Sequence, residues 1–299
     1  MQVRQLSIRP GGGGASTALL GFAASHRREY SRTCSPGALD ECPASLYLVF
    51  YPVRMRLTWP LTGRADEARL IEAAVADSDV SGIAICGAAG VGKSRITRDV
   101  LGSVATEGFD VRWVAGTSCA RGLPLGALAS WAGQGSRDSL ALVCEVIESL
   151  TSTSAGAPVV VGVDDAHLLD DLSMFVVHQI VQRRAAKVVI TVRDDDRVPP
   201  AIPELWRTDG FSRIELRPLS QGDTTTLLEA TLQGPVDQDT ADRLWKLTHG
   251  NTLYLRHIVE QSVSDGRLAE QNGIWRWSGD AAVPLGLIQL IEPRRKLCR

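Results

Sequence analysis

The stretch of sequence with the clearest chemical meaning is GAAGVGKS, residues 87–94. It follows an apolar run, residues 83–86, which predicts a buried strand, and it leads into a polar segment that can form a helix. Glycines allow the N–H groups of such a loop to turn toward a phosphate, and the N-terminus of the next helix attracts the same anion. In this pattern Lys93 reaches the β- and γ-phosphates of ATP and the Ser94 hydroxyl binds Mg²⁺. The alternative is a glycine-rich turn with a solvated lysine.

A second group of candidate site residues is the adjacent pair Asp164 and Asp165, which follows the apolar run VVVGV at 159–163. Such a run is typical of a central parallel strand that is covered on both faces. At the end of this strand, Asp164 can hold Mg²⁺ opposite Ser94, and Asp165 is placed to polarise an attacking water. On their own, two acids after a strand more often cap a helix, but the phosphate loop about 70 residues upstream favours the metal interpretation.

A third candidate is Arg193, which follows the apolar strand KVVITV at 187–192. An arginine at the tip of the strand beside the acidic strand can contact the γ-phosphate and respond to its loss. The alternative is an ion pair with one of the three aspartates that follow it, Asp194, Asp195 and Asp196.

The elements that must position these residues alternate between strand and helix from about residue 80 to residue 217. This alternation predicts an α/β fold, a doubly wound parallel-sheet P-loop NTPase domain, whose ligands bind at the carboxyl ends of the strands. Helices are expected at 68–76, with Leu70 and Ile71 at core spacing, at 139–150, with Leu140 on the apolar face, and at 174–184. Another helix is expected to begin within 121–128.

Past Pro218 the pattern becomes helical, with segments at 223–231, 239–248 and 253–264. They predict a small all-helical lid. Trp275 and Trp277 indicate a short hairpin-like element after it, and we expect both indoles to pack in a core.

Composition sets the remaining limits. We expect four parts: an N-terminal extension at 1–56, disordered or a mis-assigned start; a nucleotide-binding domain at 57–218; the lid at 219–283; and a truncated tail at 284–299. The formal net charge of −2 does not favour nucleic-acid binding. Six cysteines without metal-type spacing, and no apolar run near the ~20 residues that span a bilayer, predict a cytoplasmic protein that does not enter membranes.

Six motifs in a fixed order resemble those of a known family. They are LTGRADE, GAAGVGKS, VDDAHLLDD, TVR, ELRPLS and LTHGNTLYLRHIVEQSVSDGRL, the last followed by IWRWSG. With these motifs in this order, the sequence resembles the ATPase module of the large ATP-binding LuxR-type transcriptional regulators, which belong to the STAND branch of the AAA+-related P-loop NTPases. The similarity covers about residues 57–283.

The resemblance implies ATP and Mg²⁺ as ligands, with Gly63 and Arg64 beside the adenine. With the loop itself, the expected nucleotide-binding residues are Gly63, Arg64, Gly87, Ala88, Ala89, Gly90, Val91, Gly92, Lys93, Ser94, Arg95 and Asn251. The expected metal ligands are Ser94 and Asp164, and the expected catalytic residues are Lys93, Asp165 and Arg193.

The sequence departs from the family in two places. Gly250-Asn251-Thr252 stands where members have Gly-x-Pro, which puts the lid contact with adenine in doubt. Members also continue into winged-helix, repeat and helix-turn-helix domains, whereas this sequence ends at Arg299, so no DNA-binding domain is expected in it.

The leading hypothesis is therefore a slowly hydrolysing ATP switch, with self-association or a regulatory protein as its partner. The alternatives are a nucleotide-binding interaction module without hydrolysis, or a non-functional fragment of a regulator, and, third, a P-loop kinase.

Overall fold

The computed structural model describes residues 57–133, 139–153, 156–194 and 199–278. The expectations for residues 1–56, for the strand at 46–53 within them and for the tail at 284–299 lie outside these ranges. The four-part division of the chain stays a prediction.

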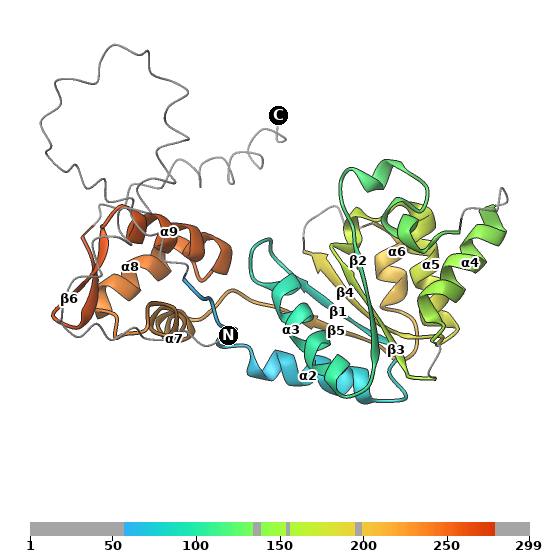
Figure 1. The fold of residues 1–299 in the computed structure, drawn as a ribbon, viewed down its shortest axis with the longest axis horizontal. Helices are drawn as coiled ribbons and strands as arrows, with labels where there is room; N and C mark the ends of the chain where they lie inside the picture. The colour runs from blue at the N-terminus through green and yellow to red at the C-terminus, as the bar shows by residue number, and fades with distance from the viewer. Residues whose placement is uncertain (1–56, 134–138, 154–155, 195–198, 279–299) are drawn as a thin grey trace, which may run out of the picture. The chain divides into compact units, whose positions relative to one another are not determined.

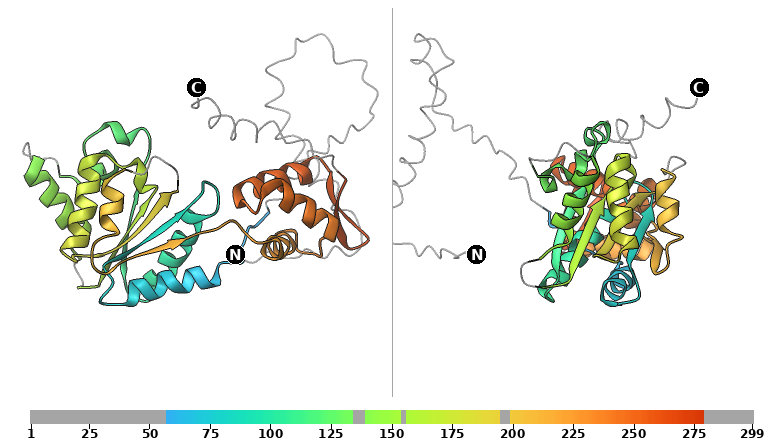
Figure 2. Two further views of the ribbon diagram at one scale, coloured as in Figure 1. Left: turned by 180° about the vertical axis from the view of Figure 1, so that it is seen from behind. Right: turned by 90° about the vertical axis from the view of Figure 1, so that its right-hand side faces the viewer.

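The centre of the nucleotide-binding part is a parallel five-stranded sheet with the order β2-β3-β4-β1-β5. Helices cover both of its faces (Figure 1, Figure 2). The predicted doubly wound α/β fold is confirmed. The strands are β1 (Gly82–Gly87), β2 (Asp110–Ala115), β3 (Val159–Asp164), β4 (Lys187–Arg193) and β5 (Phe211–Glu215).

Alternating side chains of β1 explain why the sheet needs helices on both faces. Ile83 and Ile85 enter a core with α2 (Ala65–Ala76) and α3 (Lys93–Thr106), whereas Ala84 and Cys86 face α4, α5 and α6. Because neighbouring side chains of a strand point to opposite faces, both faces of this apolar strand must be covered. The helices of the second face are α4 (Ser139–Thr151), α5 (Asp171–Gln182) and α6 (Ala201–Leu205).

Two leucines do not lie where their spacing predicts. Leu70 is 55% exposed and Leu140 is 67% exposed. The buried stripe of α2 runs through Ile71, Ala74 and Val75, one position away from Leu70. The fully buried stripe of α4 begins at Val143, and in its first turn Leu142 is only partly buried against the core, while Leu140 is exposed.

The helix expected to begin within 121–128 is present only in 3₁₀ form and is interrupted. Two short 3₁₀ helices, η1 (Ala120–Gly122) and η2 (Gly126–Trp131), occupy this region. Gly122, Pro124 and Gly126 account for the difference, because glycine and proline disfavour a continuous α-helix there.

The C-terminal part contains α7 (Gln221–Leu232), α8 (Gln238–Thr248) and α9 (Thr252–Ser264), followed by the antiparallel pair β6 (Leu268–Gln271) and β7 (Ile274–Trp277). The expected hairpin is thus present, and Trp275 and Trp277 are buried in the core that it shares with the helices. Trp59 packs against this same core from the other end of the described chain. No described helix is long and apolar enough to cross a membrane.

Candidate nucleotide-binding site

The phosphate loop joins β1 to α3 with the geometry that its glycines predict. Gly90 has φ +81° and Gly92 has φ +104°, backbone conformations that side-chain-bearing residues rarely adopt. Lys93 is the first residue of α3, and the first turn of this helix contains no acidic residue. The positive end of the helix dipole is therefore not offset within α3 and is available to an anion.

Lys93 is buried with its ammonium group turned onto the loop. It is 6% exposed, and Nζ donates to the carbonyl oxygens of Gly87 and Ala88, each at 2.9 Å. Burial lowers the pKa of Lys93, and the nearby carboxylate of Asp165 opposes this effect. Two neutral carbonyls neutralise no charge, so an anion in the loop is a better partner for this ammonium than the partners it has here.

The end of β3 lies directly beside the start of α3. The Oδ1 atom of Asp164 accepts a 2.6 Å hydrogen bond from Ser94 Oγ and a 2.7 Å hydrogen bond from Thr191 Oγ1. Its Oδ2 atom lies 3.5 Å from Arg98 Nη2. The two predicted metal ligands, 70 positions apart in the sequence, are thus in contact.

Asp165, the next residue, has a left-handed backbone with φ +50°. Its N–H donates to Thr191 Oγ1 at 2.8 Å, and its Oδ1 lies 3.5 Å from Arg193 Nε and 3.9 Å from His167 Nδ1. The acidic partner that Arg193 has among the described residues is Asp165. Of the three aspartates that follow Arg193, only Asp194 is described, and it lies 3.9 Å from Arg213.

Strand order explains how Arg193 reaches this place. β4 lies between β1 and β3, and Arg193 is the register partner of Gly87. The phosphate loop, the acidic pair and Arg193 therefore all occur at the carboxyl edge of three adjacent strands, as the sequence predicts.

A cavity of about 530 Å³ opens at this edge. Its described lining contains six cations and one acidic residue, Asp165; the cations are Arg64, Lys93, Arg95, Arg98, Arg193 and Arg256. The lining also contains apolar residues, which are Trp59, Pro60, Leu61, Leu219, Leu227 and Leu253. A cavity that offers both cations and apolar surface suits a ligand that carries several phosphates and an aromatic base.

Only some of the predicted nucleotide-binding residues line the cavity. Arg64 and the run 89–95 line the cavity, whereas Gly63, Gly87, Ala88 and Asn251 do not. A Cβ at Gly63 would lie 2.7 Å from the Asp223 side chain, so this glycine allows a close approach to α7.

Arg64 is buried at the edge of the cavity, and its guanidinium donates hydrogen bonds to backbone carbonyls. Its Nη2 atom donates to the carbonyls of Val91 and Arg217, at 3.3 and 2.6 Å, and Nη1 contacts Glu67 at 3.0 Å. This guanidinium therefore connects the phosphate loop with the segment that leads from β5 to α7.

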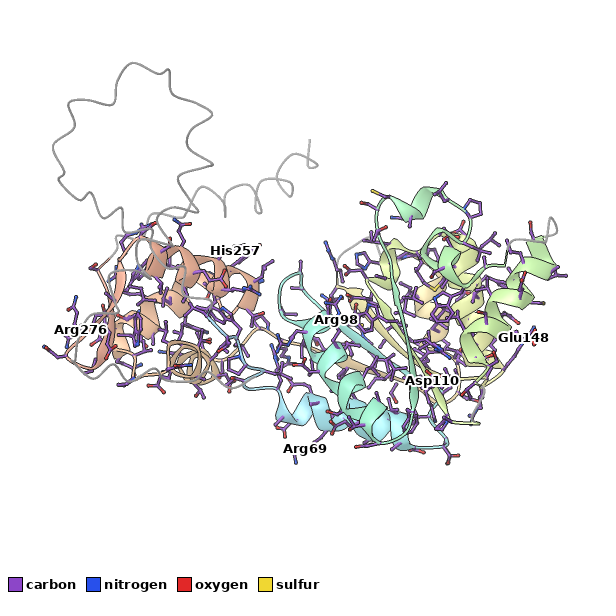
Figure 3. The ribbon with its side chains drawn as sticks, viewed as in Figure 1. Arg69, Arg98, Asp110, Glu148, His257 and Arg276 are labelled. Atoms are coloured by element: carbon purple, nitrogen blue, oxygen red, sulfur yellow. The ribbon has the colours of Figure 1, made fainter. Side chains whose placement is uncertain are left out.

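The residues of the site that were not predicted from the sequence include Thr191, Arg98, Trp59 and Arg256. Arg98, which is labelled in Figure 3, is one helical turn beyond Ser94, so its spacing offered a signal; it also stacks on Trp113, with its guanidinium 4.9 Å from the ring centroid. Thr191 is hidden inside an apolar strand, and only the pairing of β3 with β4 reveals its role.

Comparison with solved structures finds proteins with a similar fold. The Hsp104–ADP complex of S. cerevisiae matches with a TM-score of 0.51 and 18% identity, over 70% of this chain and 32% of that one. An Hsp104:casein complex in its extended conformation matches with a TM-score of 0.50 and 18% identity, over 78% and 42%. The Aeropyrum pernix ORC1 protein in complex with DNA matches with a TM-score of 0.52 and 13% identity, over 73% and 64%.

At these identities the likeness shows the fold alone, which is that of an α/β doubly wound P-loop domain. This chain spans less than two thirds of the length of each of these proteins. No protein-family model and no curated protein matches the sequence.

Proposed function

We propose that this chain is an ATP-binding, slowly hydrolysing molecular switch. The observation that carries this proposal is the 2.6 Å contact of Ser94 with Asp164 beside a buried lysine at the start of a helix. Lys93 and the other cations of the lining neutralise the phosphates, the N–H groups of the loop bind the phosphate oxygens, and the apolar residues of the lining, among them Trp59, receive the base.

Magnesium fits the oxygen atoms at the end of β3. A hydroxyl and a carboxylate are hard donors, and Mg²⁺ is commonly held by one or two such groups together with phosphates and waters. No three His, Cys, Asp or Glu side chains of the described residues converge on one point, which suits an ion that arrives with its nucleotide. When bound, Mg²⁺ supplies neutralisation of the charge on the phosphates.

In the hydrolysis step, Asp165 orients and polarises the attacking water, and Lys93 stabilises the charge that develops on the phosphoryl oxygens. To contact the γ-phosphate, Arg193 must move away from Asp165. The ion pair between these two residues is therefore lost when the site becomes active. We infer slow turnover from this competing pair.

The finer proposal is that the chain is the switch module of a LuxR-type regulator of the STAND class, working in the cytoplasm through self-association or a regulatory protein. The order and spacing of the six sequence motifs support it. The switch itself works by a difference in the contacts that ATP and ADP make with the site. An interaction module without hydrolysis is the alternative, and the pairing of Asp165 with Arg193 favours it.

Two measurements on the full chain separate these functions. Fluorescent ATP and ADP are titrated first, and phosphate release is then followed by a malachite-green assay for wild type and Lys93→Ala. A switch that hydrolyses ATP releases phosphate slowly, and Lys93→Ala abolishes that release. Tight binding without release favours the interaction module, and no binding of either nucleotide contradicts both.

A further inference from the structure

The N-terminus of α9 is attached to the phosphate loop by three hydrogen bonds. Asn251 Nδ2 donates to the Ala89 carbonyl at 2.8 Å, and Thr252 Oγ1 donates to the Gly90 carbonyl at 2.7 Å. The backbone N–H of Leu253 donates to the same Gly90 carbonyl at 3.0 Å. Two consecutive carbonyls of the loop are thus held by three consecutive residues at one helix end.

The amide of Asn251 has a second set of partners that fixes its orientation. Its Oδ1 atom accepts from the backbone N–H groups of Leu253 and Tyr254, at 3.1 and 3.3 Å, which caps α9. Because the amide is planar and its oxygen is bound to the helix end, its nitrogen is directed at the loop.

Gly90 is shaped for this contact. A Cβ at this position would lie 2.6 Å from Asn251 Oδ1 and 2.9 Å from Leu253 Cβ, too close for any real side chain. Two features therefore favour glycine at position 90: its positive φ and the close approach of α9.

The geometry of the peptide bond carries this contact through to the nucleotide site. In a trans peptide the C=O and the following N–H point in opposite directions. When the carbonyls of Ala89 and Gly90 are held toward α9, the N–H groups of Gly90 and Val91 are therefore held away from α9. These are N–H groups of the loop on which the proposed binding of phosphate depends.

From these contacts we propose that Asn251 and Thr252 are positioning residues of the phosphate loop, which hold its N–H groups ready for the phosphates of the nucleotide. The inference rests on the proposed binding of ATP. From the sequence, Asn251 is expected to contact the nucleotide directly. In this proposal, Asn251 instead acts on the nucleotide through the backbone of the loop. Each lost hydrogen bond is expected to weaken binding by about three- to tenfold.

The test measures the dissociation constant of fluorescent Mg·ATP for the full chain and four variants. Asn251→Ser keeps an oxygen that can cap α9 but removes the amide N–H that donates to the Ala89 carbonyl, and the shorter serine side chain does not extend as far toward the loop. Thr252→Val removes the hydroxyl, and Thr252→Ser restores it. Asp237→Ala removes the cap of the neighbouring helix α8 and touches no residue of the loop, so it controls for a general loosening of the C-terminal part.

We expect weaker binding for Asn251→Ser and Thr252→Val, and binding within about twofold of wild type for Thr252→Ser and Asp237→Ala. The inhibition constant of inorganic tripolyphosphate, measured by competition, should change by the same factor as that of ATP, because the effect is on the phosphates and not on the base.

Three results would overturn the inference while leaving the binding of ATP by wild type intact. The first is unchanged or tighter binding by folded Asn251→Ser and Thr252→Val. The second is an equal loss in Asp237→Ala. The third is a loss for ATP without a loss for tripolyphosphate. If wild type itself binds neither ligand, the proposed function fails together with the inference.

Discussion

Replacing Thr191 by valine should destabilise the protein by more than its small change in shape suggests. The Thr191 side chain is fully buried, and one hydroxyl serves both acidic residues: it donates to the Asp164 carboxylate at 2.7 Å and accepts from the Asp165 N–H at 2.8 Å. Valine fills the same volume but can do neither.

The magnitude follows from these two contacts. A buried hydrogen bond to a charged group contributes about 1.5–3 kcal/mol, and a backbone N–H left buried without a partner costs about 1–3 kcal/mol. Because Asp164 keeps its bond from Ser94 and the structure relaxes in part, we expect a total loss of about 2–4 kcal/mol in the free energy of unfolding.

Urea unfolding, followed by circular dichroism, compares Thr191→Val with Thr191→Ser and Thr97→Val. Thr97 is equally buried, but its hydroxyl donates only to the Lys93 carbonyl one turn back in α3, so Thr97→Val should cost about 1 kcal/mol or less. Thr191→Ser should recover most of the loss. If Thr191→Val is no less stable than Thr97→Val, the account of the acidic strand end is wrong.

Two further predictions concern buried polar groups. Burial lowers the pKa of Lys93 below its ordinary 10.5, so the unfolded chain binds this proton more tightly than the folded chain does. The stability of nucleotide-free wild type should therefore rise, relative to that of Lys93→Met, as pH increases from the lowered pKa to about 10.5. Urea midpoints of the two proteins that change with alkaline pH by the same amount would contradict this prediction. The hydroxyl of Thr231 is buried without a hydrogen-bond partner among the described residues, so Thr231→Val should raise the free energy of unfolding by about 1 kcal/mol, and a lower midpoint in thermal unfolding would count against that.

The sequence predicts the parts of this molecule that depend on local pattern. Continuous apolar runs identify β1 and β3 because both faces of these strands are covered. The spacing of glycines and Lys93 identifies the loop, because a phosphate-binding turn requires those residue types in that order. The contact of Ser94 with Asp164 follows once parallel strands place both at one edge of the sheet.

The rest depends on tertiary contacts that one sequence does not display. Thr191 reads as one more strand residue until β4 is paired with β3. From the sequence, Asn251 is expected to contact the nucleotide; its cap on α9 and its bond to Ala89 become visible only in the structure, where the phosphate loop lies beside α9. Leu140 fits an apolar stripe by spacing and is exposed, because the spacing does not say where the core ends.

The central claim is that a triphosphate and its Mg²⁺ bind between the phosphate loop and the end of β3. Its most direct test is the affinity for fluorescent ATP with and without Mg²⁺, measured for wild type and Asp164→Asn. We expect Mg²⁺ to tighten binding by wild type about tenfold or more, and this gain to be largely lost in Asp164→Asn while metal-free binding persists. An equal gain from Mg²⁺ in both proteins, or no binding of ATP by wild type, would contradict the account.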